Sequence, residues 1–138
     1  MRPFGERKIE YFYAAQTVGF GLWLSHPAGT LDSPAFAVLI RWMPEYQWAL
    51  MFTITGMIHC MALFINGRAA WTPFVRLCAT STNAVAYAAF ACGFAMLDPM
   101  TSAVYTYGIG YGGAALICIY SAAKDSVRAW ERLFAHAR

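Results

Sequence analysis

Few residues in this chain could do chemistry, and the most conspicuous is a histidine within an apolar run. The stretch TITGMIHCMALF, residues 53–64, contains His59 and Cys60 among apolar and small polar residues. A histidine there could bind haem or a metal, join helices by a hydrogen bond, or line a ligand site. Haem between helices needs two histidines at compatible depth, whereas His26 lies in a loop and His136 in the C-terminal tail. We therefore expect no haem.

The remaining reactive side chains form no catalytic or metal-binding pattern. Cys60, Cys78, Cys92 and Cys118 lack the C-x-x-C spacing of a metal site, and cysteines in apolar helices usually pack as small hydrophobes. No nucleophile has a neighbouring base and orienting group. All acids lie at or beyond the ends of the apolar runs: Glu6, Glu10, Asp32, Glu45, Asp98, Asp125 and Glu131. We predict neither an enzyme nor a proton-coupled carrier, and no cofactor.

The apolar runs themselves indicate a membrane protein. Hydrophobic residues make up 59% of the chain and charged residues 12%, about half the charge of a soluble domain. Residues 48–65, 77–97 and 100–123 contain no Lys, Arg, Asp or Glu, and each run reaches the roughly 18 residues typical of a transmembrane helix. A weaker stretch, 9–24, carries Glu10 and Gln16. Because it lacks a convincing cleavage site, we predict a retained span there and no signal peptide.

The chain is thus predicted to be an all-α integral membrane protein with a single membrane domain, residues 1–138. Four transmembrane helices at about 9–24, 46–65, 72–97 and 101–123 form a bundle. The outer loop 25–45 carries a short helix that Ser33 and Pro34 begin, either along the interface or folded into the bundle. Gly67 and the Asp98–Pro99 pair mark the other two turns. The tail 124–138 continues as an amphipathic cytoplasmic helix.

The distribution of basic residues predicts the orientation. Nine of the ten Lys and Arg residues lie on one side of the predicted spans, and only Arg41 lies on the other. The nine are Arg2, Arg7, Lys8, Arg68, Arg76, Lys124, Arg128, Arg132 and Arg138. This positive-inside bias predicts a multi-pass protein of the bacterial inner membrane with both termini cytoplasmic. The net charge of +3 is therefore a topology signal, and we expect no nucleic-acid partner.

The basic side chains of the tail suggest a lipid contact. Lys124, Arg128 and Arg132 lie opposite Val127, Trp130, Phe134 and Ala137 on a helix. Such a helix fits the anionic inner leaflet, and we predict that the three basic residues contact lipid headgroups. A frayed basic tail is the alternative, because fifteen residues are marginal for an isolated helix.

Small residues recur at spacings that bring membrane helices together. The pattern occurs in three predicted spans, at Ala15 and Gly19, at Ala84, Ala88, Ala91 and Ala95, and at Gly108, Gly112 and Ala115. Lipid gives helices no hydrophobic reason to associate, so close packing of small residues holds them together. These stripes predict helix contacts, either within one chain or between copies. The glycines of GIGYGG are not a nucleotide loop, because no strand precedes them.

Polar residues from three spans are predicted to meet at one depth. The set is Gln16, Thr55, His59, Thr80 and Asn83. A rise of 1.5 Å per residue puts His59 close to the level of Thr80 and Asn83. Polar groups inside a membrane must pair or face water. We interpret the set as a hydrogen-bond layer that sets helix register, with a water-accessible lumen or a ligand pocket as the alternative.

Three segments resemble a known group of proteins. They are GERKIEYFYAAQTVGFGLWLSHPAGTLDSPAF, PEYQWAL and FINGR…TPFVR. They are similar to the small four-span membrane proteins that tailed phages and prophages of proteobacteria encode. The resemblance covers most of the chain and implies a phage origin and an inner-membrane location. It transfers no activity and no functional residue.

These observations lead to one expected function and two alternatives. We expect a non-enzymatic structural or interaction factor that acts on the host membrane, by superinfection exclusion or by modulating a host complex. The first alternative is a holin-like permeabilising oligomer, in which polar faces of the second and third spans line a lesion. The weaker alternative is an accessory subunit of a respiratory or transport complex. The expected partners are the lipid bilayer and either further copies of the chain or a host membrane protein.

Overall fold

The computed structural model describes residues 7–27, 31, 34–65, 69–97 and 101–135. For residues 133–135 it describes the backbone alone. Its elements in chain order are α1 (Lys8–Leu24), the 3-10 turn η2 (Pro34–Phe36), α2 (Ala37–Trp42), α3 (Glu45–Ile65), α4 (Thr72–Ala95), α5 (Ala103–Tyr105), the π-helical η3 (Thr106–Tyr111) and α6 (Gly112–Ala135). The predicted all-α class is confirmed for this part of the chain. The predicted cap and turn residues Ser33, Gly67, Asp98 and Pro99 lie outside it.

Three helices of the described residues are long and apolar enough to cross a membrane. They are α3, α4 and the continuous stretch Ala103–Arg132, which joins α5, η3 and α6. These helices make the fold compatible with a membrane protein. The remaining long helix, α1, has 17 residues and begins at Lys8, with Glu10 in its first turn. A fourth span at α1 therefore stays a prediction.

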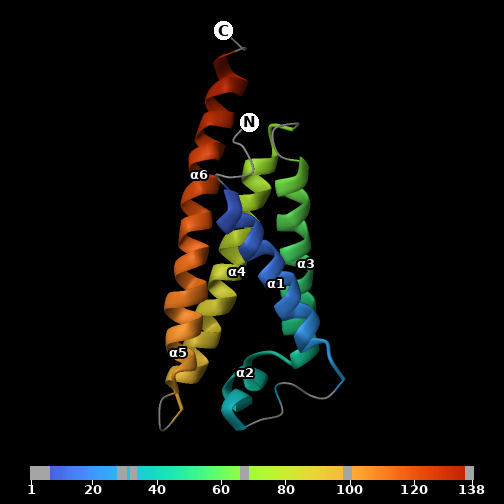
Figure 1. The fold of residues 1–138 in the computed structure, drawn as a ribbon, viewed down its shortest axis with the longest axis vertical. Helices are drawn as coiled ribbons and strands as arrows, with labels where there is room; N and C mark the ends of the chain where they lie inside the picture. Colours follow the sequence, from blue (N-terminus) through green and yellow to red (C-terminus); the bar gives the residue numbers. More distant parts are fainter. Residues whose placement is uncertain (1–6, 28–30, 32–33, 66–68, 98–100, 136–138) are drawn as a thin grey trace.

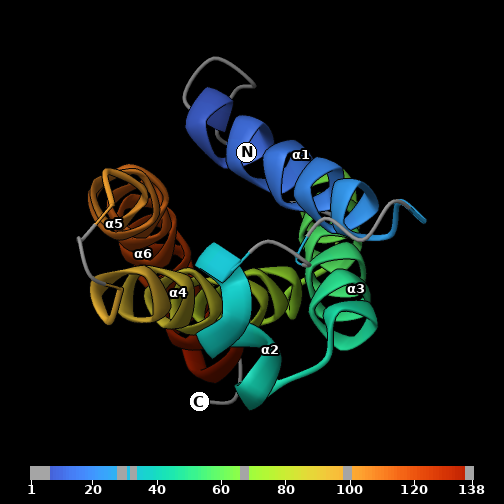
Figure 2. The same ribbon diagram turned by 90° about the horizontal axis from the view of Figure 1, so that it is seen from below.

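The long helices lie side by side along one axis (Figure 1). The first turn of α1 and the last turns of α6 lie at one end, which we call the terminal end, and α2 lies at the other, the α2 end. Viewed along the axis, α1 lies beside α3, and α4 lies between α3 and α6 (Figure 2). Contacts between α1 and α6 are few.

Two glycines let α1 and α3 cross at very short distance. A Cβ atom added to Gly21 would lie 2.5 Å from the backbone nitrogen of Thr53, and one added to Gly56 would lie 2.8 Å from that of Val18. Both contacts are with backbone, which cannot move aside as a flexible side chain can. Close approach of this kind is what small residues provide between membrane helices.

Aromatic side chains fill the half of the bundle next to α2. Phe52 lies at the centre of this aromatic cluster, with its ring centroid 5.0 Å from those of Phe20 and Tyr87 and 5.7 Å from that of Phe90. Edge-to-face and tilted pairs at such distances are favourable arrangements. The rings come from α1, α3 and α4, so the aromatic cluster joins the three helices.

The short α2 packs onto the bundle. Its Leu39 is fully buried and lies against α4, where a Cβ atom added to Gly93 would be 2.9 Å from a Leu39 methyl carbon. The indole N–H of Trp48 donates to the Leu39 carbonyl at 3.2 Å. Of the two predicted placements, the structure therefore has the helix folded against the bundle; its position relative to a membrane stays a prediction.

The C-terminal helix does not bend where the predicted tail begins. From Gly112 to Ala135 it is one uninterrupted α-helix, and its last turns extend past the other helices at the terminal end (Figure 1). No proline or glycine follows Gly113, so the sequence contains no helix breaker near residue 123. The predicted tail helix is thus an extension of the fourth predicted span. Its apolar face is described for Val127 and Trp130, which are exposed, while Ala137 and the Phe134 side chain lie outside the described parts.

Candidate functional site

Charged side chains from three helices meet inside the terminal end and form an ionic cluster of Arg7, Glu10, Arg76, Ser121 and Asp125. The Arg76 guanidinium donates to Glu10, with Nε 3.0 Å from Oε2, and its Nη1 lies 3.2 Å from Oδ2 of Asp125. Arg76 is 0% exposed and Glu10 is 3% exposed. A charge pair so thoroughly removed from solvent needs excellent geometry to offset its lost hydration.

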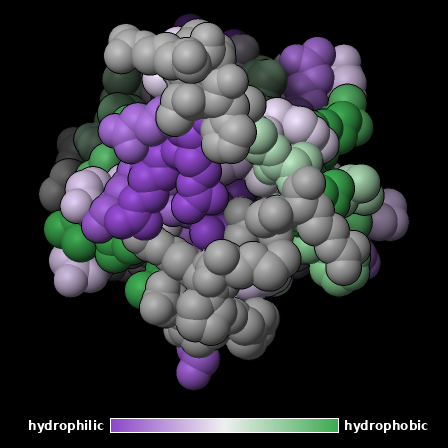
Figure 3. All heavy atoms as spheres, turned by 90° about the horizontal axis from the view of Figure 1, so that it is seen from above, coloured by the Kyte–Doolittle hydropathy of each residue, from purple (hydrophilic) through white to green (hydrophobic). Residues whose placement is uncertain are grey.

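Two further contacts complete the ionic cluster. Arg7 donates to the same Asp125 oxygen at 2.8 Å, and the Ser121 hydroxyl donates to Oε1 of Glu10 at 2.7 Å. Among the described residues, the cluster thus holds two arginines and two carboxylates. Seen from the terminal end, hydrophilic residues gather on one part of the face beside apolar ones (Figure 3).

The elements explain why these side chains meet. Glu10 lies in the first turn of α1 and Arg76 lies one turn after the start of α4, at Thr72. Asp125 lies on α6 at the level where that helix passes the first turns of α1 and α4. The three helix segments therefore meet at this level. As expected from the sequence, Glu10 lies at the end of the first apolar run, in the first turn of α1, but its burial was not predicted. The sequence did contain a sign of the pairing. Glu10 and Arg76 have opposite charges, and each lies about one turn from the start of a predicted span.

The predicted polar layer forms in part, next to this cluster. The Thr55 hydroxyl on α3 donates to the side-chain oxygen of Asn83 on α4. His59, one turn further along α3, is fully buried, and its ring centroid lies 6.2 Å from that of Tyr13 on α1. Sequence reasoning did not include Tyr13, which occurs three residues after Glu10. We use the name polar layer for Tyr13, Thr55, His59 and Asn83.

The other two predicted members of the layer bond elsewhere. The Thr80 hydroxyl is fully buried and donates to the Arg76 carbonyl of its own helix at 2.7 Å. The Gln16 amide is half-buried and donates to the Tyr111 hydroxyl of η3 at 3.2 Å. Gln16 therefore connects α1 to the last predicted span and not to His59.

Several buried atoms of the polar layer have no hydrogen-bond partner among the described residues. They are the Tyr13 hydroxyl, both ring nitrogens of His59 and the side-chain nitrogen of Asn83. Native proteins pair nearly all buried polar groups with protein or with ordered water. The ionic cluster beside the polar layer differs in that both of its carboxylates accept hydrogen bonds from arginine.

The aromatic cluster closes the polar layer toward the α2 end. The Tyr87 ring stacks on Tyr111 at 4.9 Å and lies 6.0 Å from Tyr13. Beyond it, Phe90 contacts Trp48 at 5.0 Å and Tyr107 at 5.3 Å. Aromatic rings thus lie between the polar layer and the α2 end.

The predicted small-residue stripes are placed differently on each helix. A Cβ atom added to Gly108 would lie 3.6 Å from the Cβ of Ala91, and Ala115 is fully buried. Near Gly112 such an atom would meet only the Tyr107 carbonyl of its own helix. Ala84 is half-buried against the core, whereas Ala15, Gly19, Ala88 and Ala95 are exposed. Contacts between copies through the exposed residues stay a prediction.

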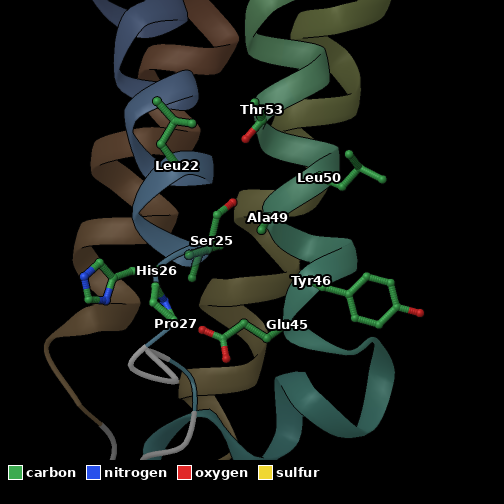
Figure 4. A pocket seen from close by; sticks show the side chains of 10 residues that line it. Leu22, Ser25, His26, Pro27, Glu45, Tyr46, Ala49, Leu50 and Thr53 are labelled. Carbon is green, nitrogen blue, oxygen red and sulfur yellow. The ribbon is translucent and has the colours of Figure 1, made fainter.

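An open pocket lies at the α2 end, between the end of α1 and the start of α3 (Figure 4). Its volume is about 560 Å³. The lining residues are Leu22, Leu24, Ser25, His26, Pro27, Glu45, Tyr46, Ala49, Leu50 and Thr53. One oxygen of the Glu45 carboxylate accepts the backbone N–H of Leu31 at 3.1 Å, so the acid holds the chain in place beside the pocket.

The remaining predicted residues lie on the surface or outside the site. Lys124, Arg128 and Arg132 are exposed on the outer turns of α6. Within the described ranges, no three His, Cys, Asp or Glu side chains are grouped to hold a metal ion, and the four cysteines are free.

The fold and the site define a helical bundle with apolar helices compatible with a membrane and with a charged cluster and a polar layer in its interior. Comparison with known proteins finds no family model, no curated protein and no solved structure that matches the chain. A functional assignment therefore depends on the residues of this chain alone.

Proposed function

We propose that the protein is a small non-enzymatic interaction factor of the bacterial inner membrane, of phage or prophage origin. In this proposal it acts on the host membrane by excluding superinfecting phage or by modulating a host complex. The observation that carries the proposal is the burial of the polar faces of α3 and α4 within a single chain. His59, Thr80 and Asn83 are each 0% exposed.

This burial supports an interaction factor over a holin-like oligomer. A membrane lesion lined by the second and third predicted spans needs their polar faces on the surface of each chain. Neighbouring copies could then line a water-filled opening with these faces. Here the faces pack against α1 and against each other, and the opposite face of α3 exposes Ile54, Met57 and Met61. Such an exterior suits lipid.

The buried carboxylate of Glu10 bears on the prediction that the protein is not a proton-coupled carrier. A proton-coupled carrier requires an acid inside the bundle that can release and accept a proton. Glu10 is buried, yet it accepts hydrogen bonds from Arg76 and Ser121, which fix its carboxylate between α4 and α6. This pairing supports a structural role for the acid.

The two ends of the bundle offer the surfaces for contact. At the terminal end α6 extends past the other helices and exposes Lys124, Arg128 and Arg132. In the proposed orientation these side chains face the anionic inner leaflet, where each basic residue contributes about 1 kcal/mol. At the α2 end, Arg41 and Trp42 are exposed on α2.

The test is controlled expression in a bacterium, with membrane potential and phage DNA uptake recorded together. We expect an unchanged potential and reduced uptake. A variant with Lys124, Arg128 and Arg132 all replaced by Gln should lose the effect. The matched control, K124R with R128K and R132K, keeps every charge and should retain it at equal protein level. Sudden depolarisation at a set time would contradict the proposal and favour the holin-like alternative.

A further inference from the structure

We infer that water molecules occupy the interior of the bundle among Tyr13, His59 and Asn83, as an enclosed hydration site between the ionic cluster and the aromatic cluster. The inference is independent of the proposed function. Its basis is a set of neutral polar side chains that are nine-tenths or more buried and contain four atoms without a protein partner.

The geometry places these atoms around one small region. Tyr13 and His59 meet ring to ring at 6.2 Å across α1 and α3. Asn83 on α4 is bonded to Thr55, which lies one helical turn from His59 on α3. One turn rises about 5.4 Å, so the amide and the imidazole lie within reach of a bridging molecule. Three helices therefore surround the proposed site.

Pairing rules explain why these groups need an occupant. A neutral imidazole has one donor and one acceptor, a phenol can do both, and the free end of the asparagine amide only donates. In an apolar environment every such group left unpaired is strongly unfavourable. Buried water resolves this situation in globular proteins by bonding to two or more otherwise unsatisfied groups.

The chemistry of the lining favours water over an ion. The groups that face the site are neutral, and in the adjacent ionic cluster both Glu10 and Asp125 already have an arginine partner. An occupant must both accept from the Asn83 amide and donate to whichever imidazole nitrogen is unprotonated. Water does both, whereas a halide cannot donate and a metal cation cannot accept.

The site is closed on the α2 side and adjoins charge on the other. Tyr87, Phe90 and Phe52 separate it from the α2 end. Toward the terminal end, Tyr13 lies one turn from Glu10 on α1, and Thr80 bonds to the Arg76 carbonyl between Arg76 and Asn83 on α4. The proposed water would therefore lie next to the ionic cluster, and the aromatic cluster would keep it from reaching the α2 end of the bundle.

The test measures magnetisation transfer from water to ring nitrogens in the full-length protein reconstituted in lipid. Histidine and tryptophan are labelled with ¹⁵N, and the His59 signal is assigned by its loss in His59→Phe. His26 is exposed and serves as the wet reference, whereas the Trp48 indole is buried on the Leu39 carbonyl and serves as the dry one. We expect transfer to His59 to build up several times faster than transfer to Trp48, close to that of His26.

Transfer to His59 as slow as transfer to Trp48 would overturn the inference. A second variant locates the water. Asn83→Leu removes the amide and should reduce transfer to His59 by more than half, whereas the matched substitution Thr82→Leu, on the exposed side of α4, should leave it unchanged. Unchanged transfer in Asn83→Leu would place the water elsewhere and likewise overturn the site.

Discussion

The ionic cluster and the polar layer are adjacent regions of one interior, yet the carboxylates of the first are paired with arginines, whereas the Tyr13 and His59 side chains of the second make no hydrogen bond among the described residues. In the ionic cluster, Glu10 accepts from Arg76 and Ser121, and Asp125 accepts from Arg7 and Arg76. In the polar layer, which lies on the α2 side of the ionic cluster, only the Thr55–Asn83 hydrogen bond joins two side chains. Within the part of the chain that the structure describes, neither nitrogen of His59 has a hydrogen-bond partner.

The difference follows from the energy of burying charge. An unpaired ion in an apolar interior is far more unfavourable than an unpaired neutral group. Charged side chains are therefore retained inside only where the fold supplies partners of opposite sign. Neutral groups such as the Tyr13 phenol and the His59 imidazole can remain without a protein partner, since water can bond to them. Substitutions in the two regions should therefore have unequal effects.

The largest expected effect comes from removing one charge of the ionic cluster. Arg76→Met would leave the Glu10 and Asp125 carboxylates without their shared partner. Loss of one member of a buried pair typically costs about 3–5 kcal/mol of unfolding free energy. Denaturant titration in lipid–detergent micelles measures it, with Arg128→Met on the exposed face of α6 as the control. Equal stability of the two variants would show that the buried cluster does not hold the helices.

A second variant sharpens the same result. Glu10→Met in the Arg76→Met background removes the stranded carboxylate and replaces the pair with apolar side chains. Because an apolar replacement of a whole buried pair is often neutral or stabilising, part of the lost stability should return. A double variant less stable than Arg76→Met would contradict this interpretation of the cluster.

The next effect tests the helix crossing that brings α1 to both regions. Gly56→Val would push a side chain into the backbone of α1 at Val18, 2.8 Å from the position of the new Cβ. Overpacking of this kind costs about 1–3 kcal/mol. Gly19→Val is the matched control, because no atom outside its own helix lies within 4 Å of an added Cβ there. A destabilisation equal to that of Gly19→Val would show that α1 can move aside.

Gly19 and Gly21 on α1 show what could and could not be predicted from the sequence. The spacing of Ala15 and Gly19 predicted a helix contact there, but within the described chain the close contact of α1 is made at Gly21. Two residues along an α-helix correspond to a rotation of about 200°, so Gly19 and Gly21 face nearly opposite directions. Periodicity finds the faces of a helix, but only packing decides which face meets a neighbour.

Depth along a helix was predictable, whereas partners were not. Apolar runs without charge located α3 and α4, and counting residues inward placed His59 and Asn83 at similar levels, next to the observed Thr55–Asn83 bond. The pairing of Glu10 with Arg76 depends on the rotation of three helices around the bundle axis. No local pattern records that rotation, so charges that looked like topology signals turned out to be interior groups.

Within the polar layer the effects should be smaller. Asn83→Leu removes the acceptor of the Thr55 hydroxyl, which can still donate to the Met51 carbonyl of its own helix at 2.7 Å. Because that second acceptor remains, we expect a loss of about 1 kcal/mol, the usual net value of one hydrogen bond. The same micelle titration measures it. A loss as large as that of Arg76→Met would remove the distinction between the two regions.

The smallest effect is expected at His59. Its ring is fully buried, but the described residues offer neither ring nitrogen a hydrogen-bond partner. His59→Leu therefore removes no bond between side chains, and the released water returns to bulk. Polar contacts inside membrane proteins average about 0.6 kcal/mol, and we expect His59→Leu to fall at or below that value. The micelle titration measures it beside Ile58→Leu, an exposed neighbour on α3. A loss of several kcal/mol would mean that His59 is bonded as firmly as the charges beside it.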